Sequence, residues 1–319
     1  MNWLFLLLSL LVLLGGGEFF IRGAVAIARR LRVSPVVMGL TIVAFGTSAP
    51  ELAVNVIAAW KGETGITFGN IVGSNIANVG LILGLSATLG AMTIDRSFLK
   101  WNLPLMLVAT GLTVMLCMDR VWGQSSDVVT RQDGIILLAL FVGFVWVTVR
   151  PALRAKDERE ADDEDHPSKH WVHSIVTMTI GLVGVLVGSH HTVNSAVTLA
   201  SALGVSQAVI GITLIAVGTS LPELATSLIA IAKGHADLAV GNVVGSNAFN
   251  LLLILGVSST VHDVSIPDGG MIDLAVMAVF SLALFLFAIT HQRKIVRWEG
   301  AVLLATYATY IAWRVGLTG

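Results

Sequence analysis

The amino-acid sequence predicts an all-α integral membrane protein made of two related halves with five transmembrane helices each. Of its 319 residues, 55% are hydrophobic and only 12% are charged, and the mean hydropathy is +0.85. These values lie far outside the range of soluble proteins. The apolar residues come in long runs, close to the roughly 20 residues that a helix needs to cross a bilayer. In addition, a long segment of the first half recurs in the second half without a gap.

Hydropathy predicts ten membrane-spanning helices, some of them with a broken centre. They lie near residues 3–21, 34–59, 66–90, 99–117, 132–150, 173–192, 206–231, 237–260, 272–290 and 297–315. We therefore divide the chain into a first repeat (1–150), a polar linker (151–171) and a second repeat (172–319). The first apolar run lacks a basic segment before it and a small-residue cleavage pattern after it, so we expect a retained helix and not a signal peptide.

The lysines and arginines predict the orientation in the membrane. When alternate loops are counted, fifteen of the 19 fall on one side and only Lys61, Arg120, Arg131 and Arg314 on the other. The richer side is expected to face the cytoplasm, so both termini lie outside and the linker lies inside. Because five is an odd number, the second repeat must enter the membrane inverted. Inverted repeats are a recurrent plan of secondary transporters, with the substrate site near the midplane.

The duplicated segment is the most informative part of the chain. Residues 39–84 read GLTIVAFGTSAPELAVNVIAAWKGETGITFGNIVGSNIANVGLILG, and residues 211–256 read GITLIAVGTSLPELATSLIAIAKGHADLAVGNVVGSNAFNLLLILG. Equivalent positions are 172 residues apart, as Glu51 and Glu223 are. A glutamate inside a membrane span is costly to bury and is by default a functional residue. Two at equivalent positions make a chance occurrence improbable.

The residues before each glutamate predict a break in the helix. Pro50 has no N–H group and its ring clashes with the carbonyl of Gly46, four residues earlier. Freed carbonyls at membrane depth are tolerated where they line a cavity. Thr47 and Ser48 add hydroxyl oxygens beside Glu51. Carbonyl, hydroxyl and carboxylate oxygens are the ligands that hard cations prefer.

The next helix of each repeat supplies a second polar wall. Asn70, Ser74 and Asn78 are spaced by four, which places them in one stripe on a helix, and Asn242, Ser246 and Asn250 repeat the pattern. Neighbouring glycines allow close helix packing. The two repeats together are expected to bring two glutamates, several amides and hydroxyls to the membrane centre. The formal charge of −2 on two ionised glutamates matches one divalent cation.

Other features receive a structural interpretation. A GxxxG-like glycine spacing usually reflects helix packing. A lone intramembrane serine usually hydrogen-bonds within its own helix. The run 157–165, DEREADDED, is interpreted as a solvated loop, because it lacks the pattern of a calcium-binding loop. Cys117 is the only cysteine and predicts neither a disulfide nor a thiolate metal cluster. Nothing predicts a nucleic-acid partner or a bound cofactor.

The motif GTSxPE followed by GNxxGSNxxN, present twice, resembles the repeats of the calcium/cation antiporter superfamily, and the prokaryotic sodium/calcium exchangers look most similar. The resemblance covers nearly the whole chain. It implies that Ca²⁺ and Na⁺ are the transported ions and share the two glutamates. The ligands it implies are Glu51, Glu223, Thr47, Ser48, Thr219, Ser220, Ser74, Asn78, Ser246 and Asn250, with backbone carbonyls near Ala44 and Ala216.

The sequence departs from this pattern in one respect. Some sodium/calcium exchangers have an aspartate at the position of Asn250, and potassium-dependent relatives have acidic residues at one or both positions occupied here by Asn78 and Asn250. Two central carboxylates remain, which neutralise Ca²⁺ but leave the number of exchanged Na⁺ ions open and weaken the case for potassium dependence. Proton coupling also stays open.

The expected function is antiport of Ca²⁺ against Na⁺ by alternating access, in the plasma (inner) membrane of a bacterium, with the lipid bilayer as surroundings. A monomer is consistent with this plan. The alternatives are a proton-coupled Ca²⁺/cation exchanger, a cation channel and an intramembrane hydrolase. A hydrolase would need an H-E-x-x-H motif, an Asp pair or a Ser/His couple, and the sequence has none of these.

Glu18 and Arg22 are spaced to pair on the first helix. His190 and His191 are expected to be structural, with a gating or proton-linked role as the alternative.

Overall fold

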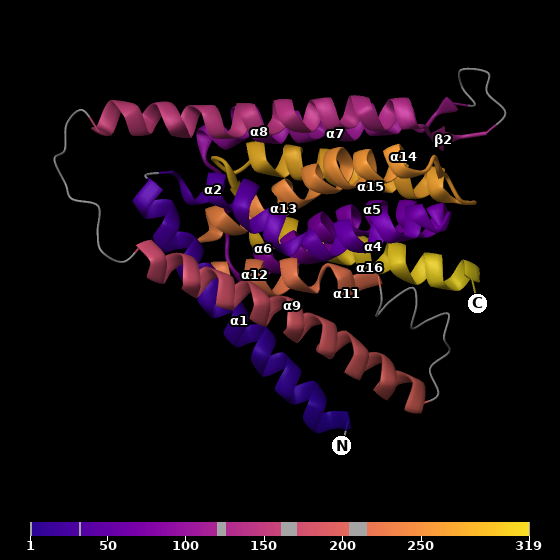
Figure 1. Ribbon diagram of the computed structural model, residues 1–319, viewed down its shortest axis with the longest axis horizontal. Coiled ribbons are helices and arrows are strands. Elements are labelled where there is room, and N and C mark those ends of the chain that lie inside the picture. The colour runs from indigo at the N-terminus through magenta and orange to yellow at the C-terminus, as the bar shows by residue number, and fades with distance from the viewer. Residues whose placement is uncertain (1, 32, 120–125, 161–170, 204–215, 319) are drawn as a thin grey trace.

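The computed structural model describes residues 2–31, 33–119, 126–160, 171–203 and 216–318, and these parts of the chain are almost entirely helical (Figure 1). The predicted all-helical architecture is therefore confirmed. Most helices lie side by side in a layered body, and two long helices slope away from it (Figure 1).

The described part of the first half contains eight helices, three π-helical segments and two short strands. In chain order they are α1 (Asn2–Leu31), α2 (Pro35–Met38), η1 (Gly39–Val43), α3 (Ala44–Thr47), α4 (Ala49–Trp60), α5 (Thr64–Ala77), η2 (Asn78–Leu83), α6 (Gly84–Leu89), β1 (Met92–Thr93), η3 (Phe98–Asn102), α7 (Leu103–Leu116), β2 (Val128–Val129) and α8 (Arg131–Glu160).

The described part of the second half follows the same order. It contains α9 (Trp171–Ala202), α11 (Ala216–Thr219), α12 (Leu221–Ala232), α13 (Ala236–Ala248), η6 (Phe249–Ile254), α14 (Leu255–Val261), β3 (Val264–Ser265), α15 (Gly270–Ile289), β4 (Lys294–Ile295) and α16 (Arg297–Thr318). The short helices α3 and α11, like the strands β1 and β3, lie 172 residues apart, so the duplication read from the sequence is also a duplication of structure.

Two antiparallel ribbons join the halves. Strand β1 pairs with β4, with Met92 opposite Ile295, and β2 pairs with β3, with Val129 opposite Val264. Each ribbon thus contains one strand from each half. Helix α7 leads from the first ribbon to the second, whereas the equivalent helix α15 leads from the second back to the first. The two equivalent helices pack against each other and run in opposite directions.

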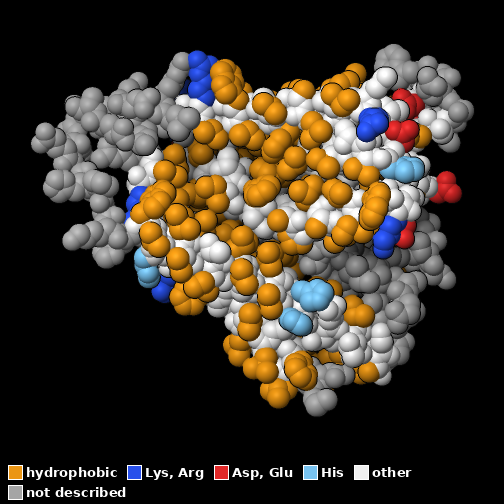
Figure 2. All heavy atoms as spheres, in the orientation of Figure 1, with side chains coloured by type: hydrophobic (Ala, Val, Ile, Leu, Met, Phe, Trp, Pro, Cys, Tyr) orange, Lys and Arg blue, Asp and Glu red, His pale blue; other side chains and the backbone are white. Residues whose placement is uncertain are grey.

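The described helices include enough apolar segments for several membrane crossings. Seven are long and apolar enough to span a bilayer, and the bent pair Pro35–Thr47 and Ala49–Trp60 makes an eighth. On the face shown in Figure 2, hydrophobic side chains cover the middle of the body, and most lysines, arginines and acidic residues lie toward its two ends. The chain is an integral, multi-pass membrane protein.

Several segments end at other residues than predicted. Helix α1 continues ten residues beyond the predicted end at 21, and α8 continues through Glu160 into the predicted polar linker. Residues 161–170 of the linker and the start of the seventh predicted span, 206–215, lie outside the described residues. Helix α16 occupies the tenth predicted span but is not among the seven.

Helices α1 and α9 form a closely packed pair. Gly16 of α1 lies against the backbone of Gly184 and Val185, and Gly188 of α9 lies against the backbone of Leu13. A Cβ atom at these glycines would collide with the main chain of the partner helix, so the two axes approach as closely as backbones allow. In Figure 1 this pair is the part of the molecule that slopes away from the body.

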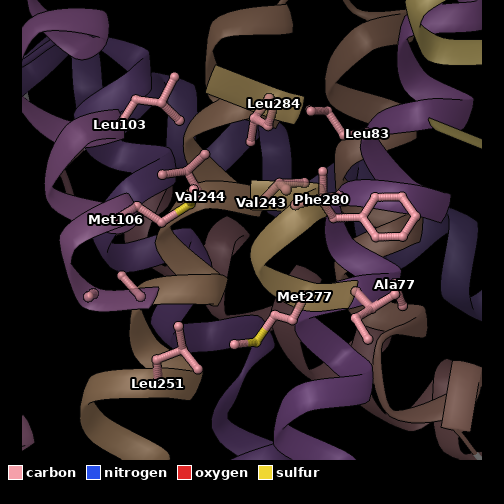
Figure 3. Close-up of a cluster of buried hydrophobic side chains, with 14 of the residues drawn as sticks. Ala77, Leu83, Leu103, Met106, Val243, Val244, Leu251, Met277, Phe280 and Leu284 are labelled. Atoms are coloured by element: carbon pink, nitrogen blue, oxygen red, sulfur yellow. The ribbon is translucent and has the colours of Figure 1, made fainter. Parts of the chain in front are cut away.

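The body has a dense apolar core. Figure 3 shows part of it, where side chains from both halves interlock: Leu83, Leu103 and Met106 of the first half meet Val243, Val244, Met277 and Leu284 of the second. Because the core crosses between the halves, neither half has a complete core of its own, and the body packs as one unit.

We predict that Gly245→Ala destabilises the body. A Cβ at Gly245 would lie 2.7 Å from the carbonyl oxygen of Leu40 and 2.8 Å from the Ala44 Cβ. The backbone there is packed on both sides, so the overpacking should lower the free energy of unfolding by about 1–3 kcal/mol. Thermal unfolding of the detergent-solubilised protein measures the change. Gly143→Ala, on an exposed face of α8 with open space around it, is the control, and equal melting temperatures for both variants would contradict the prediction.

Candidate cation site

The predicted helix break is present in both halves. Helix α3 ends at Thr47 and α4 begins at Ala49, with a bend of 48° between the two segments. Ser48 at the break has φ −86° and ψ 3°, and Ser220 at the equivalent break has φ −88° and ψ 7°. A proline follows at the second position of each new helix, where its missing N–H is tolerated.

Each break places a glutamate in the first turn of a helix in the protein interior. Glu51 in α4 is 2% exposed, and Glu223 in α12 is 1% exposed. The positive end of the helix dipole stabilises a negative charge at this position. The two carboxylates are also close enough to repel each other. A cation between them would relieve both the repulsion and the burial of charge.

Side chains from both halves surround Glu223. The hydroxyl of Ser48, from the first half, donates a hydrogen bond of 2.9 Å to Oε1 of Glu223. Thr47, also from the first half, and Ser246, from α13 of the second, lie near the same carboxylate. The predicted residues of the two repeats therefore converge on one centre and do not form two separate sites.

Amide side chains cross between the halves in equivalent pairs. Asn78 donates through Nδ2 to Oδ1 of Asn247 over 2.9 Å, and Asn250 donates to Oδ1 of Asn75 over 3.2 Å. These pairs are related by the 172-residue offset. In each pair the side-chain oxygen Oδ1 of the donating residue, Asn78 or Asn250, has no hydrogen-bond donor of its own.

Two threonines make the same kind of crossing. Thr47 donates to Oδ1 of Asn242 over 3.4 Å, and Thr219 donates to Oδ1 of Asn70 over 3.1 Å. The hydroxyl of Thr47 is also within 3.1 Å of the Val43 carbonyl of its own helix. The hydroxyl hydrogens are therefore directed at protein acceptors, while hydroxyl oxygens keep lone pairs for other partners.

A set of buried oxygens at this centre has no hydrogen-bond partner. It consists of Glu51 Oε2, Glu223 Oε2, Ser74 Oγ, Ser246 Oγ, Asn78 Oδ1, Asn250 Oδ1 and Ser220 Oγ. Buried polar atoms are nearly always satisfied, so such a concentration calls for an explanation. Among the described residues, no three His, Cys, Asp or Glu side chains cluster. Two carboxylates among neutral oxygens fit the oxygen-only coordination of a hard cation such as Ca²⁺.

Some of the predicted cation ligands have different surroundings from the others. Ala44 is buried in α3, and its carbonyl lies 3.4 Å from the Thr47 hydroxyl and accepts the N–H of Ser48. Ala216 begins α11, and its side chain lies outside the described residues. Ser220 and Ser48 differ, since the structure pairs only Ser48 with a glutamate across the centre.

Sequence reasoning missed the two asparagines that hold the amide pairs, Asn75 and Asn247. The available signal was their identity at equivalent positions of the two GSN motifs. Asn55, also missed, is fully buried and donates to the Glu51 carbonyl over 2.7 Å. Its equivalent is Ser227, so comparison of the repeats gives no signal for it.

The expected Glu18–Arg22 pair is present and has a third member. Glu18 forms ion pairs with both Arg22 and Lys233, the residue that follows α12. His190 and His191 are exposed on α9, and Nε2 of His190 lies 3.0 Å from Nδ2 of Asn194 one turn away. The structure therefore places these histidines away from the buried glutamates.

The sequence matches the family described as "Sodium/calcium exchanger protein" over residues 1–150 and 173–316. The chain belongs to the sodium/calcium exchanger family. Its relatives in this family include the putative antiporter CaxA of Alkalimonas amylolytica, 38% identical over 96% of both chains, and the sodium/calcium exchanger MaX1 of Methanosarcina acetivorans, 34% identical over 97% of both. The resemblance to the superfamily that the sequence predicted is thus confirmed.

The fold agrees with that of a solved family member. A structure of the sodium-calcium exchanger NCX_Mj aligns with a TM-score of 0.83 at 35% identity and covers 98% of each chain.

We predict that Asn75→Ala and Asn247→Ala each destabilise the protein by about 1–3 kcal/mol, because the loss of either carbonyl leaves a buried amide donor unpaired. Thermal unfolding in detergent measures the effect. Asn194→Ala, at a site exposed on α9, is the control and should change the melting temperature little. Wild-type stability of both core variants would show that the amide pairs do not contribute.

Proposed function

We propose that this chain is a secondary antiporter that exchanges Ca²⁺ for Na⁺ across the membrane by alternating access. The observation that carries the proposal is the buried centre, where Glu51 and Glu223 face unpartnered hydroxyl and amide oxygens. Family membership supports the same conclusion.

In this proposal the two glutamates bind either Ca²⁺ or Na⁺ but not both at once. Two carboxylates neutralise one Ca²⁺, and Ca²⁺ takes six to eight oxygen ligands. Ser74, Ser246, Asn78 and Asn250 would contribute side-chain oxygens, Thr47, Ser48, Thr219 and Ser220 hydroxyl or carbonyl oxygens, and Ala44 and Ala216 carbonyl oxygens. Competition for shared ligands couples the movement of one ion to the countermovement of the other.

Alternating access would come from movement of the α1–α9 pair over the helix breaks. Gly46, just before the first break, faces Leu182 of α9 and Phe20 of α1, and Gly218, before the second break, faces Val193 of α9. The pair therefore covers both breaks. If it slides as a unit along the body, it can uncover one break while it covers the other, which gives the centre access to one side at a time.

The proposed topology has ten spans in two inverted repeats, with both termini outside and the linker in the cytoplasm of a bacterium. The opposite directions of α7 and α15 support the inversion. The excess of lysine and arginine on one side supports the orientation. A monomer holds all the residues named for the centre.

Two alternative functions make different predictions for transport. A proton-coupled Ca²⁺ exchanger would use the same two glutamates but would respond to a pH gradient. A cation channel would pass Ca²⁺ without a counter-ion and needs a continuous path with weak sites. The close packing of α1 and α9 over the breaks supports an exchanger, because it closes the centre.

We predict that Glu51→Gln and Glu223→Gln each reduce Ca²⁺ uptake by Na⁺-loaded proteoliposomes to the level of protein-free liposomes. Each substitution removes half of the central charge and keeps the shape of the side chain. Glu63→Gln, at an exposed position after α4, is the matched control and should transport normally. Both central variants should still insert in the membrane, and normal transport by either one would contradict the site.

We also predict that Ca²⁺ uptake requires an outward Na⁺ gradient. Radiolabelled Ca²⁺ uptake is compared in proteoliposomes with a Na⁺ gradient, with none, and with an imposed pH gradient alone. Uptake only with the Na⁺ gradient is expected. Uptake driven by the pH gradient alone would show proton coupling, and uptake with neither gradient would show a channel.

A further inference from the structure

A second polar feature lies outside the central site, in a cleft between α1 and the turn that joins α12 to α13. Its volume is about 260 Å³. One wall is a single face of α1, formed by Ile21, Arg22, Val25, Ala26 and Arg29. The other wall consists of Lys233, which follows α12, and His235, which precedes α13.

The cleft has an excess of positive charge. Arg22, Arg29 and Lys233 line it, and Glu18 forms ion pairs with Arg22 and Lys233. Among the described residues, three cations against this one carboxylate leave a charge of +2. Asp237 lies nearby in sequence, but its carboxylate accepts the backbone N–H of Leu238 at the start of α13.

The same wall of the cleft also carries apolar side chains. Apolar side chains of Ile21, Val25 and Ala26 lie between the cationic groups. The cleft therefore combines an apolar wall with several donors suited to an anion.

We propose that this cleft binds a phosphate ester, held between Arg22 and Arg29 of α1 and Lys233 of the α12–α13 turn. Arginine and lysine side chains bind phosphate oxygens through charge-assisted hydrogen bonds. The ester comes from an anionic phospholipid headgroup or from a soluble phosphate ester. Basic clefts between transmembrane helices on the lysine- and arginine-rich side of a membrane protein are suited to anionic headgroups.

The position of the cleft links ligand binding to the transport cycle, and this part rests on the proposed function. Arg22 and Arg29 belong to the helix pair proposed to move, whereas Lys233 follows α12, the helix that carries Glu223 in its first turn. A phosphate bound to both would hold α1 at one position along the body. Anionic lipid would therefore change the rate of exchange without contact with the transported ions.

The test is a binding measurement that does not depend on transport. Native mass spectrometry counts the lipids retained by the detergent-solubilised protein during titration with phosphatidylglycerol or, as a comparison, the zwitterionic phosphatidylcholine. We expect preferential retention of phosphatidylglycerol. Arg29→Gln and Lys233→Gln should each weaken it about fivefold, the effect of one cation near an anionic surface. Arg96→Gln, which removes an equal charge at an exposed position outside the cleft, should retain wild-type affinity.

A competition arm identifies the source of the phosphate. If glycerol phosphate displaces the bound lipid, the cleft takes soluble phosphate esters; if it does not, the cleft takes lipid headgroups with their chains. Either result supports the proposal. Equal retention of both lipids, or wild-type affinity in both Arg29→Gln and Lys233→Gln, would overturn it.

Failure of the proposed function would be visible separately. Glu51→Gln should bind phosphatidylglycerol normally, because its side chain lies outside the cleft. Transport is then compared in phosphatidylcholine vesicles with and without phosphatidylglycerol, and the response to the anionic lipid should be lost in Arg29→Gln and kept in Arg96→Gln.

Discussion

At the centre of this protein two buried carboxylates, Glu51 and Glu223, lie among neutral polar side chains, and much of the architecture answers that constraint. An ionised glutamate removed from water must be compensated by dipoles, hydrogen-bond donors or a cation. The breaks at Ser48 and Ser220 turn helix N-termini toward Glu51 and Glu223. The Ser48 hydroxyl supplies a donor across the centre. The close packing around the breaks keeps these dipoles in place.

The duplication also contributes to stability, because buried polar groups of the two halves pair with each other. Several polar groups of each half find their partner in the other half, as in the crossed pairs of Asn78 with Asn247 and Asn250 with Asn75. The symmetry is incomplete, because Ser48 contacts a glutamate and Ser220 does not. In the alternating access proposed above, exchange of these unequal arrangements between the two halves would give the second state.

The sequence was sufficient for the all-helical architecture, the duplication, both helix breaks and the Glu18–Arg22 pair, because each depends on hydropathy, on repeated residues, on proline or on a spacing of four residues. It was insufficient where the outcome depends on tertiary partners. The same residue type at the equivalent positions Asn75 and Asn247 singles out both residues. It does not reveal that each accepts a hydrogen bond from an amide side chain of the other half. Lys233 joins Glu18 only because α12 ends beside α1. The extension of α8 through Glu160 occurs in a polar segment where hydropathy has no signal.

The two mixed ribbons also constrain how the chain is made. Strand β1 emerges from the ribosome long before its partner β4, and β2 likewise precedes β3. During synthesis the first half therefore sits in the membrane with open strand edges and unpaired core amides. Its tertiary structure can be completed only after the last helices have been inserted, because β4 and part of the shared core come from the end of the chain.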